Sequence, residues 1–181
     1  MRKSLGLTLL ELLIVLAVLA ILATMVGPAW NSVVERNRIT THANAFVTAA
    51  TLARSEATRD RETVLLCASR MGSNPRTCDG NTWSEGWIVI SEEARDDGDD
   101  PIRVWDAPAG DPLFDIQDGS TEVAFSANGR VDDDLDILLR MGNTDGDVED
   151  TRHCRQLVIN ASGQARANSE WRGENPCEDE D

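Results

Sequence analysis

An almost unbroken run of apolar residues near the amino terminus sets the pattern of the chain. The run from Leu7 to Val26 has 20 residues, and Glu11 is the only charged residue among them. A helix of this length rises about 30 Å, which is the thickness of a bilayer's hydrocarbon core. Arg2 and Lys3 precede the run and predict that this end faces the cytoplasm. The pattern therefore predicts a membrane-spanning helix.

A second, amphipathic pattern follows Gly27-Pro28, where proline predicts a kink or local melting of the helix. Apolar residues then recur at alternating spacings of four and three, which is one face of a helix. We expect this helix to end near Asp60, and its small side chains would let a sheet approach closely. The apolar face consists of Ile39, Ala43, Phe46, Ala50, Ala53 and Ala57, and the polar side of Arg36, Arg38, Thr48, Arg54, Ser55, Arg59 and Asp60.

Short apolar runs separated by turn residues make up the rest of the chain. Such a pattern predicts an antiparallel sheet or a two-sheet sandwich, with Trp83, Trp87 and Trp105 in the core or packing against loops. Pro108 and Pro112 predict a loop. The candidate strands are Thr63–Cys67, Gly86–Ile90, Ile102–Trp105, Glu122–Phe125, Ile137–Leu139 and Leu157–Ile159.

Glu11 decides between several interpretations of the apolar run. A cleaved secretory signal has a shorter apolar core and a small-residue cleavage site behind it. A plain membrane anchor explains the length of the run but not its acid. A buried core helix lacks a second segment of similar hydrophobicity to pack around it. A carboxylate at the centre of a membrane helix costs roughly 2.5–3.5 kcal/mol, less towards an interface, so we expect Glu11 to have a partner.

Charge and cysteine content describe the part of the chain outside the membrane. There are 32 acidic against 17 basic residues, a net charge of −15, which argues against a general nucleic-acid surface. The four cysteines lack the spacing of a metal site and are expected to form disulfides outside the cytoplasm. Four cysteines allow three pairings, and local loops favour Cys67–Cys78 and Cys154–Cys177.

The polar residues give little support for an enzyme or a cofactor. No Ser-His-Asp or Cys-His arrangement is apparent, and His42 is expected on the helix surface. Acidic runs suit Ca²⁺, but none has the EF-hand spacing, so we expect solvated loops and no metal. The runs are Asp96–Asp100, Asp132–Asp136, Asp145–Asp147 and Glu178–Asp181.

The amino terminus resembles the type IV pilin superfamily, whose short basic leader ends in glycine. The resemblance implies that prepilin peptidase cuts after Gly6 and that the new terminus, Leu7, is N-methylated. Thr8 and Glu11 then fall on the family's second and fifth mature positions, and Glu11 would pair with the amine of a neighbouring subunit during assembly. The usual first residue is Phe, so Leu7 is a departure. Loss of Arg2 and Lys3 with the leader would give a mature charge of −15 − 2 = −17.

The remainder resembles the GspH/FimT branch of minor pilins and pseudopilins. The resemblance lies in Leu66-Cys67-Ala68-Ser69, Trp83–Trp87, Arg103–Trp105, Phe125–Arg130 and Cys154–Ile159. It implies an α+β fold, with a long N-terminal helix packed on an antiparallel β-sandwich-like domain. The expected divisions are a leader (1–6), a transmembrane assembly helix (7–27), its amphipathic continuation (28–61) and a periplasmic β-rich domain with an acidic tail (62–181).

The implied function is structural. The chain would be a single-pass protein of the bacterial inner membrane with its C-terminal domain in the periplasm. It would then join other minor and major pilins or pseudopilins, at or near the tip of a type IV pilus or a type II secretion pseudopilus, and prime assembly. Which of the two fibres it serves stays open.

A second function comes from branch members that bind DNA during natural transformation. Their signature is Gly-Arg-x-Arg, and the matching segment here is Gly163-Gln164-Ala165-Arg166, which lacks one arginine. Arg166, Arg172 and Arg155 could form a small basic patch. Each lost arginine weakens phosphate binding, and the acidic chain adds repulsion, so DNA uptake is the lesser expectation.

Overall fold

The computed structural model describes residues 8–70, 72, 77–110, 112–116, 119–132, 135–141 and 154–168. For residues 23–32, 115–116, 135–136, 138, 140–141 and 168 only the backbone is described. The chain forms two compact units, Met1–Asn37 and Arg38–Asp181.

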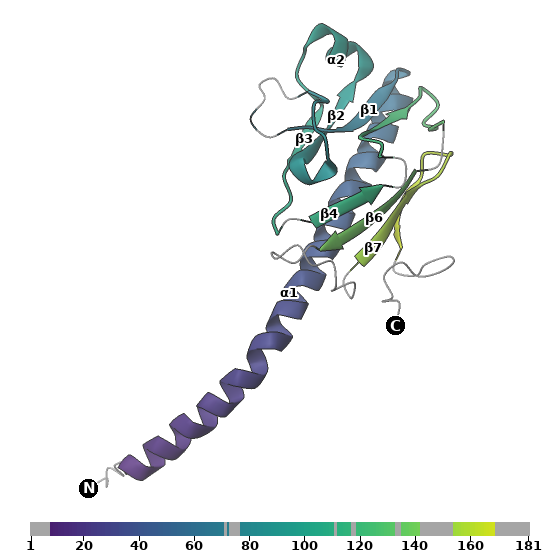
Figure 1. Ribbon diagram of the computed structural model, residues 1–181. Coiled ribbons are helices and arrows are strands. Elements are labelled where there is room, and N and C mark those ends of the chain that lie inside the picture. Colours follow the sequence, from purple (N-terminus) through teal and green to yellow (C-terminus); the bar gives the residue numbers. More distant parts are fainter. Residues whose placement is uncertain are drawn as a thin grey trace, which may run out of the picture. The chain divides into compact units, whose positions relative to one another are not determined.

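A single long helix contributes residues to both units. Helix α1 spans Leu9–Asp60, so it ends where the sequence predicts, and Arg61 follows with a left-handed φ of 59° (Figure 1). The backbone is helical through Gly27-Pro28, so the expectation of local melting there is wrong. Proline removes one intrahelical hydrogen bond but leaves the flanking ones in place, which lets a long helix continue past it.

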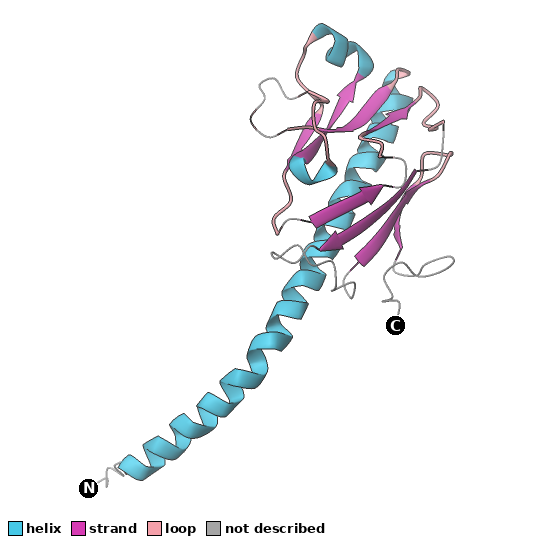
Figure 2. Cartoon of the chain, viewed as in Figure 1, coloured by secondary structure: helices cyan, strands magenta, loops and turns pink. Residues whose placement is uncertain are grey.

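The second unit contains two four-stranded antiparallel sheets (Figure 2). The first has the strand order β3-β2-β1-β5 and the second β4-β6-β7-β8. The strands are β1 Val64–Ala68, β2 Gly86–Ser91, β3 Arg103–Asp106, β4 Pro112–Ile116, β5 Glu122–Phe125, β6 Leu135–Met141, β7 Cys154–Ile159 and β8 Ala165–Asn168. The short helices are η1 Trp83–Glu85 and α2 Glu92–Asp97.

The main core lies where the second half of α1 meets both sheets. The predicted apolar face of α1 is fully buried, from Ile39 to Ala57. Phe46 from that face makes edge contacts with Trp83 and Trp87, at centroid distances of 5.1 and 5.7 Å. Most of the other members of this face are alanines, whose small side chains let the sheets approach the helix closely. A long helix packed on antiparallel sheets confirms the predicted α+β fold.

A smaller apolar cluster occupies the opposite face of the first sheet. We call it the outer cluster, and it consists of Leu65, Cys67, Ile88 and Ile90. Cys78 and Ala94 of α2 pack against it. Strands β1 and β2 are therefore buried on both faces, because alternate residues point to the main core and to the outer cluster.

Several local predictions differ from the structure. Pro112 begins strand β4 instead of holding a loop, which is possible because β4 is an edge strand and proline is tolerated at a strand's first residue. Strand β8 and helix α2 were not expected. Arg54, placed on the polar side of the helix, is half-buried. Trp105 is also only half-buried, whereas Trp83 and Trp87 lie in the core.

Candidate functional site

The first turn of α1 carries both residues that the sequence assigns to assembly. Thr8 precedes the helix, and its Oγ1 accepts a hydrogen bond from the backbone N–H of Glu11 at 3.2 Å. The carbonyl of Thr8 accepts from the N–H of Leu12, also at 3.2 Å. Thr8 is thus the N-cap, and it satisfies one of the donors that a helix start leaves without partners. The Glu11 side chain is exposed in the same turn.

The spacing of Thr8 and Glu11 is also the sequence signature of a helix start, which was not predicted. Thr8-Leu9-Leu10-Glu11 has the T-x-x-E spacing of a capping box, in which the cap and the third helical residue serve the same turn. An acid in the first turn is also favoured by the positive end of the helix dipole. Threonine and glutamate at this spacing therefore start the helix independently of any role in assembly.

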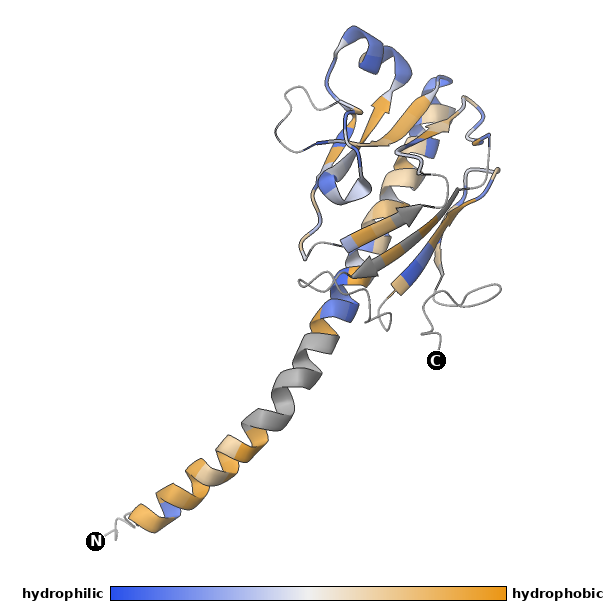
Figure 3. Cartoon of the chain, in the orientation of Figure 1, coloured by the Kyte–Doolittle hydropathy of each residue, from blue (hydrophilic) through white to orange (hydrophobic). Residues whose placement is uncertain are grey.

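The helix surface around Glu11 is apolar and uncovered. Every described residue from Thr8 to Leu22 is exposed, and Figure 3 shows the start of the helix as mostly hydrophobic. Among the described residues, no helix combines the length and hydropathy required of a membrane span. Gly6 and Leu7, the predicted cleavage and methylation positions, lie outside the described residues, as do the side chains of the last four residues of the predicted span.

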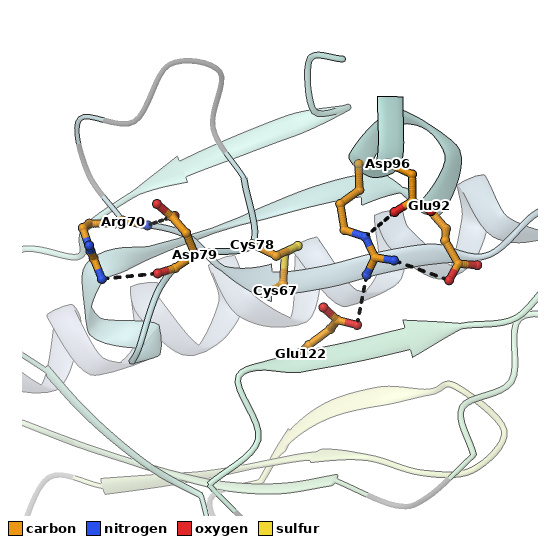
Figure 4. Close-up of a disulfide and its surroundings, with 8 residues drawn as sticks. Cys67, Arg70, Cys78, Asp79, Glu92, Asp96 and Glu122 are labelled. Atoms are coloured by element: carbon orange, nitrogen blue, oxygen red, sulfur yellow. Dashed lines mark hydrogen bonds and ion pairs between the residues drawn. A yellow bond between two sulfur atoms is a disulfide. The ribbon is translucent and has the colours of Figure 1, made fainter. Parts of the chain in front are cut away.

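The cysteine pairing is confirmed where it is described. Cys67 and Cys78 form a disulfide with a Cα–Cα distance of 5.4 Å (Figure 4). Beside it, the backbone N–H of Arg70 donates to the Asp79 carboxylate at 3.0 Å, and the Arg70 guanidinium donates to the Asp79 carbonyl at 3.5 Å. The disulfide and Arg70 therefore close the same loop. Cys154 is also disulfide-bonded, and Cys177, its predicted partner, lies outside the described residues.

The Asp96–Asp100 run lies at the end of helix α2. Ser91 caps the start of α2, and Gly98 ends it with a left-handed φ of 77°. Arg95 contacts Glu92, Asp96 and Glu122 at 3.6, 3.1 and 3.7 Å (Figure 4). No group of three metal-ligating side chains occurs within the described residues. The run is exposed. Of the Asp132–Asp136 run, residues 133 and 134 lie outside the described residues and only the side chain of Asp132 is described, while Asp145–Asp147 and Glu178–Asp181 lie wholly outside.

The charged residues at the end of α1 influence one another directly. Arg59 donates two hydrogen bonds to the Asp60 carboxylate, at 3.0 and 2.9 Å. These bonds lower the pKa of Asp60 and raise the pKa of Arg59, to which the attraction of Glu56 also contributes. Arg59 and Asp60 are both exposed, and exposed ion pairs contribute little to stability.

Two nearly identical turns stack on one another beside α1. One runs from Ser126 to Arg130 and the other from Asn160 to Gln164, and in each a glycine with φ near 74° donates to the residue three positions earlier. A side chain at Gly163 would collide with the Gly129 carbonyl, which also accepts from Arg54 Nε at 3.2 Å. Gly129 therefore supplies a left-handed turn conformation that other residues avoid.

The stacked turns change the interpretation of the Gly-x-x-Arg segment. Gly163 is required by packing, because only a residue without a Cβ fits against Gly129. Arg166 is exposed on edge strand β8, where its guanidinium donates to Gln164 at 3.1 Å. Arg155 is half-buried on β7, one strand away, and Arg172 lies outside the described residues.

His42 makes a contact with the backbone of a distant loop. It is half-buried on α1, less exposed than expected, and its Nε2 lies 3.0 Å from the carbonyl of Ala109.

Two protein-family models match parts of this chain. The family model described as type II transport protein GspH matches residues 42–163, and the prokaryotic N-terminal methylation motif matches residues 1–27. No curated protein gives a significant match.

Two crystal structures of one minor pilin share the fold of this chain. The type IV minor pilin FimU of Pseudomonas aeruginosa is 21% identical, with a TM-score of 0.54 over 74% of this chain and 90% of that one. A second crystal form of FimU gives 19% identity and a TM-score of 0.51, over 71% and 91% of the two chains. The minor pseudopilin EpsH of Vibrio cholerae is 10% identical, with a TM-score of 0.43 over 72% and 96%.

The GspH model covers more than half of the chain, and the methylation motif covers the predicted leader and anchor. Proteins of this kind are structural and non-enzymatic. Their amino-terminal motif implies processing by prepilin peptidase, anchoring in the inner membrane before assembly, and association with other pilins. The chain belongs to the GspH family and is a minor pilin or pseudopilin.

Proposed function

We propose that this chain is incorporated at or near the tip of a type IV pilus or a type II secretion pseudopilus, where it primes assembly with other minor pilins. One observation carries the proposal: within the part of the chain that is described, the Glu11 side chain is exposed in the first turn of α1 among apolar side chains that nothing covers, and capping of the helix start by Thr8 leaves this charge without an opposite charge. FimU, which has a similar fold, is described as a type IV minor pilin.

The chemistry of the first turn supplies the driving force. Cleavage after Gly6 creates a positively charged amine at Leu7, four residues from Glu11. The amine meets the positive end of its own helix dipole, which is unfavourable, and the carboxylate lies in apolar surroundings. A second subunit offset along the helix axis brings the amine of one chain to the carboxylate of the other. Each charge then neutralises its partner, the condition for keeping both in a low dielectric.

The test replaces Glu11 in the full chain in its native host. Glu11→Val is expected to be cleaved and inserted normally but to be absent from the sheared fibre fraction. Glu11→Asp, the matched control, keeps the charge and is expected to retain partial incorporation. Normal incorporation of Glu11→Val would refute the role of the carboxylate, and labelling along the whole fibre, not at its ends, would refute the tip position.

Leader processing is tested separately. Gly6→Val is expected to leave the leader attached, with the protein held in the membrane. Mass spectrometry of the wild-type chain is expected to find an N-methylated Leu7 at the amino terminus. A mature chain that begins at another residue would refute the assigned junction.

DNA uptake is the second candidate, and the observation in its favour is the exposure of Arg166 on edge strand β8. A gel-shift assay of the full chain in detergent, at low salt, tests it. DNA binding requires a shift that Arg166→Ala weakens and Arg130→Ala, at another exposed arginine, does not. The net charge of −15 leads us to expect no shift at micromolar protein.

A further inference from the structure

The second unit exposes large apolar side chains in only one stretch of its described residues. They are Ile102 and Val104, which are 43% and 38% exposed, and Leu113, which is 46% exposed. Val104 lies on β3 and Leu113 on β4, and both strands are edge strands of their sheets. Figure 1 shows β3 and β4 on the same side of the two sheets. We call Ile102, Val104 and Leu113 the apolar edge.

The two opposite edges are built differently. Strand β5, at the other edge of the first sheet, buries Val123 and Phe125 and exposes only Glu122 and Ala124. Strand β8, at the other edge of the second sheet, exposes Arg166 with small neighbours. Charged residues are a usual protection of an edge strand against pairing with another chain. Strand β3 also exposes Arg103 and Asp106, but at these two edges large apolar side chains face solvent as well, which occurs at neither β5 nor β8.

One side of strand β3 is available for pairing with a further strand. Within the described sheets it pairs only with β2, so its other side has no strand neighbour. Val104 is paired with Ile88 of the outer cluster, so the exposed side chain continues a buried apolar layer to the edge of the sheet. On the other face, the Arg103 guanidinium lies 5.0 Å from the Trp105 ring and covers it.

The charge around β3 defines the kind of segment that fits. Residues 96–106 contain Asp96, Asp97, Asp99, Asp100 and Asp106 against one base, Arg103, so their net charge is −5 + 1 = −4. The four aspartates that precede the strand are exposed. A segment with acidic side chains would be repelled here, whereas basic side chains beside an apolar pair would be attracted.

We propose that β3 binds an extended segment of a neighbouring pilin subunit, which adds a strand to the first sheet. The segment places alternate apolar side chains on Ile102 and Val104 and presents a basic residue to the aspartates of residues 96–100. Main-chain hydrogen bonds supply affinity, and the side chains supply selectivity, as in other cases of strand addition. This inference rests on the proposed function, because it names the contact through which the chain meets another subunit.

Site-specific photo-cross-linking in the native host tests it on the full chain. The photoreactive residue p-benzoylphenylalanine replaces Val104 in one strain and Ala124, on the opposite edge strand β5, in the control strain. Position 104 is expected to give a cross-link to another pilin subunit in the fibre fraction, with the cross-linked peptide in an extended, basic segment. Position 124 is expected to give at least tenfold less product.

Charge variants then test the chemistry. Val104→Lys should lower the recovery of the neighbouring subunit about tenfold, whereas Ala124→Lys, with the same added charge, should leave it unchanged. Formation of the Cys67–Cys78 disulfide in both variants checks that they fold. Equal cross-linking at both positions, a cross-link to a helix of the neighbour, or a cross-link to a protein outside the pilin family overturns the inference. Absence of the wild-type chain from the fibre fraction would refute the proposed function. Failure of the inference alone leaves the wild-type chain in the fibre fraction, so the two failures can be told apart.

Discussion

Gly163 and Gly98 have nearly the same backbone conformation but very different surroundings. Their φ angles are 75° and 77°, in the region that side chains with a Cβ disfavour. A Cβ added at Gly98 would meet nothing within 4 Å, whereas one added at Gly163 would collide with the carbonyl of Gly129. The Gly98→Ala variant therefore measures conformational cost alone, and the Gly163→Ala variant measures the same cost plus the close contact.

The two costs differ enough to be separated. A left-handed conformation costs an alanine roughly 1–2 kcal/mol, which both variants share. Inserting a methyl group where there is no room costs typically about 1–3 kcal/mol more. The Gly129 turn is held against α1, because the Gly129 carbonyl accepts a hydrogen bond from Arg54 Nε at 3.2 Å. Gly163→Ala is thus expected to cost about 2–5 kcal/mol.

Thermal unfolding of the full chain in detergent, followed by the fluorescence of buried Trp83 and Trp87, gives the comparison. For a domain of this size each kcal/mol lowers Tm by about 2–4 °C, so Gly163→Ala should lower Tm by about 4–20 °C and Gly98→Ala by about 2–8 °C. Within this experiment the first shift should be clearly larger. Equal shifts would show that the stacked turns can relax, and would refute the packing role of the glycine in the Gly-x-x-Arg segment.

Three further variants or conditions have defined outcomes. Thr8→Ala should cost about 1 kcal/mol of helix stability by removing the acceptor for the Glu11 N–H, seen as faster amide exchange in micelles, while Thr8→Ser should restore protection. Reduction of the Cys67–Cys78 disulfide, whose members are 11 positions apart, should cost about 3 kcal/mol, and an unchanged Tm after complete reduction would argue against it. The lowered pKa of Asp60 means that its ion pair stabilises the fold above the usual aspartate pKa and stops doing so as pH falls through the lowered value. Arg59→Gln should therefore move the NMR titration midpoint of Asp60 upward, and an unmoved midpoint would remove the cause assigned here.

The parts of the fold that repeat at a fixed period could be predicted from sequence. The apolar face from Ile39 to Ala57 follows the helical period over several turns, so its burial was predictable. Glu122–Phe125 alternates apolar and polar residues, and the observed strand has the same bounds. Helix α2 has no such pattern. It depends on the Ser91 cap and the left-handed Gly98, which are local signals of a short helix.

Features that depend on distant parts of the chain could not be predicted. Arg54 has a polar side chain on the outer side of the helical pattern, yet it is half-buried because the Gly129 carbonyl, 75 residues away, accepts its hydrogen bond. Strand β8 contains two small residues and an arginine, which favour no strand by themselves, and pairing with β7 holds it in place. Of the candidate site, the spacing of Thr8 and Glu11 was predictable, but the apolar edge on β3 and β4 depends on strand order.

The uncovered apolar start of α1 limits the environments in which this protein can exist as a single chain. Between Leu9 and Leu22, 11 large apolar residues are each at least half exposed in the single chain. Covering a side chain of this kind is worth about 1.5–3 kcal/mol when complete, so leaving all of them in water would cost on the order of 10 kcal/mol or more. That penalty is comparable to the whole folding stability of an ordinary domain. If the subunit moves from the membrane into a fibre as proposed, we therefore expect this helix to exchange lipid directly for the helices of neighbouring subunits, without passing through water.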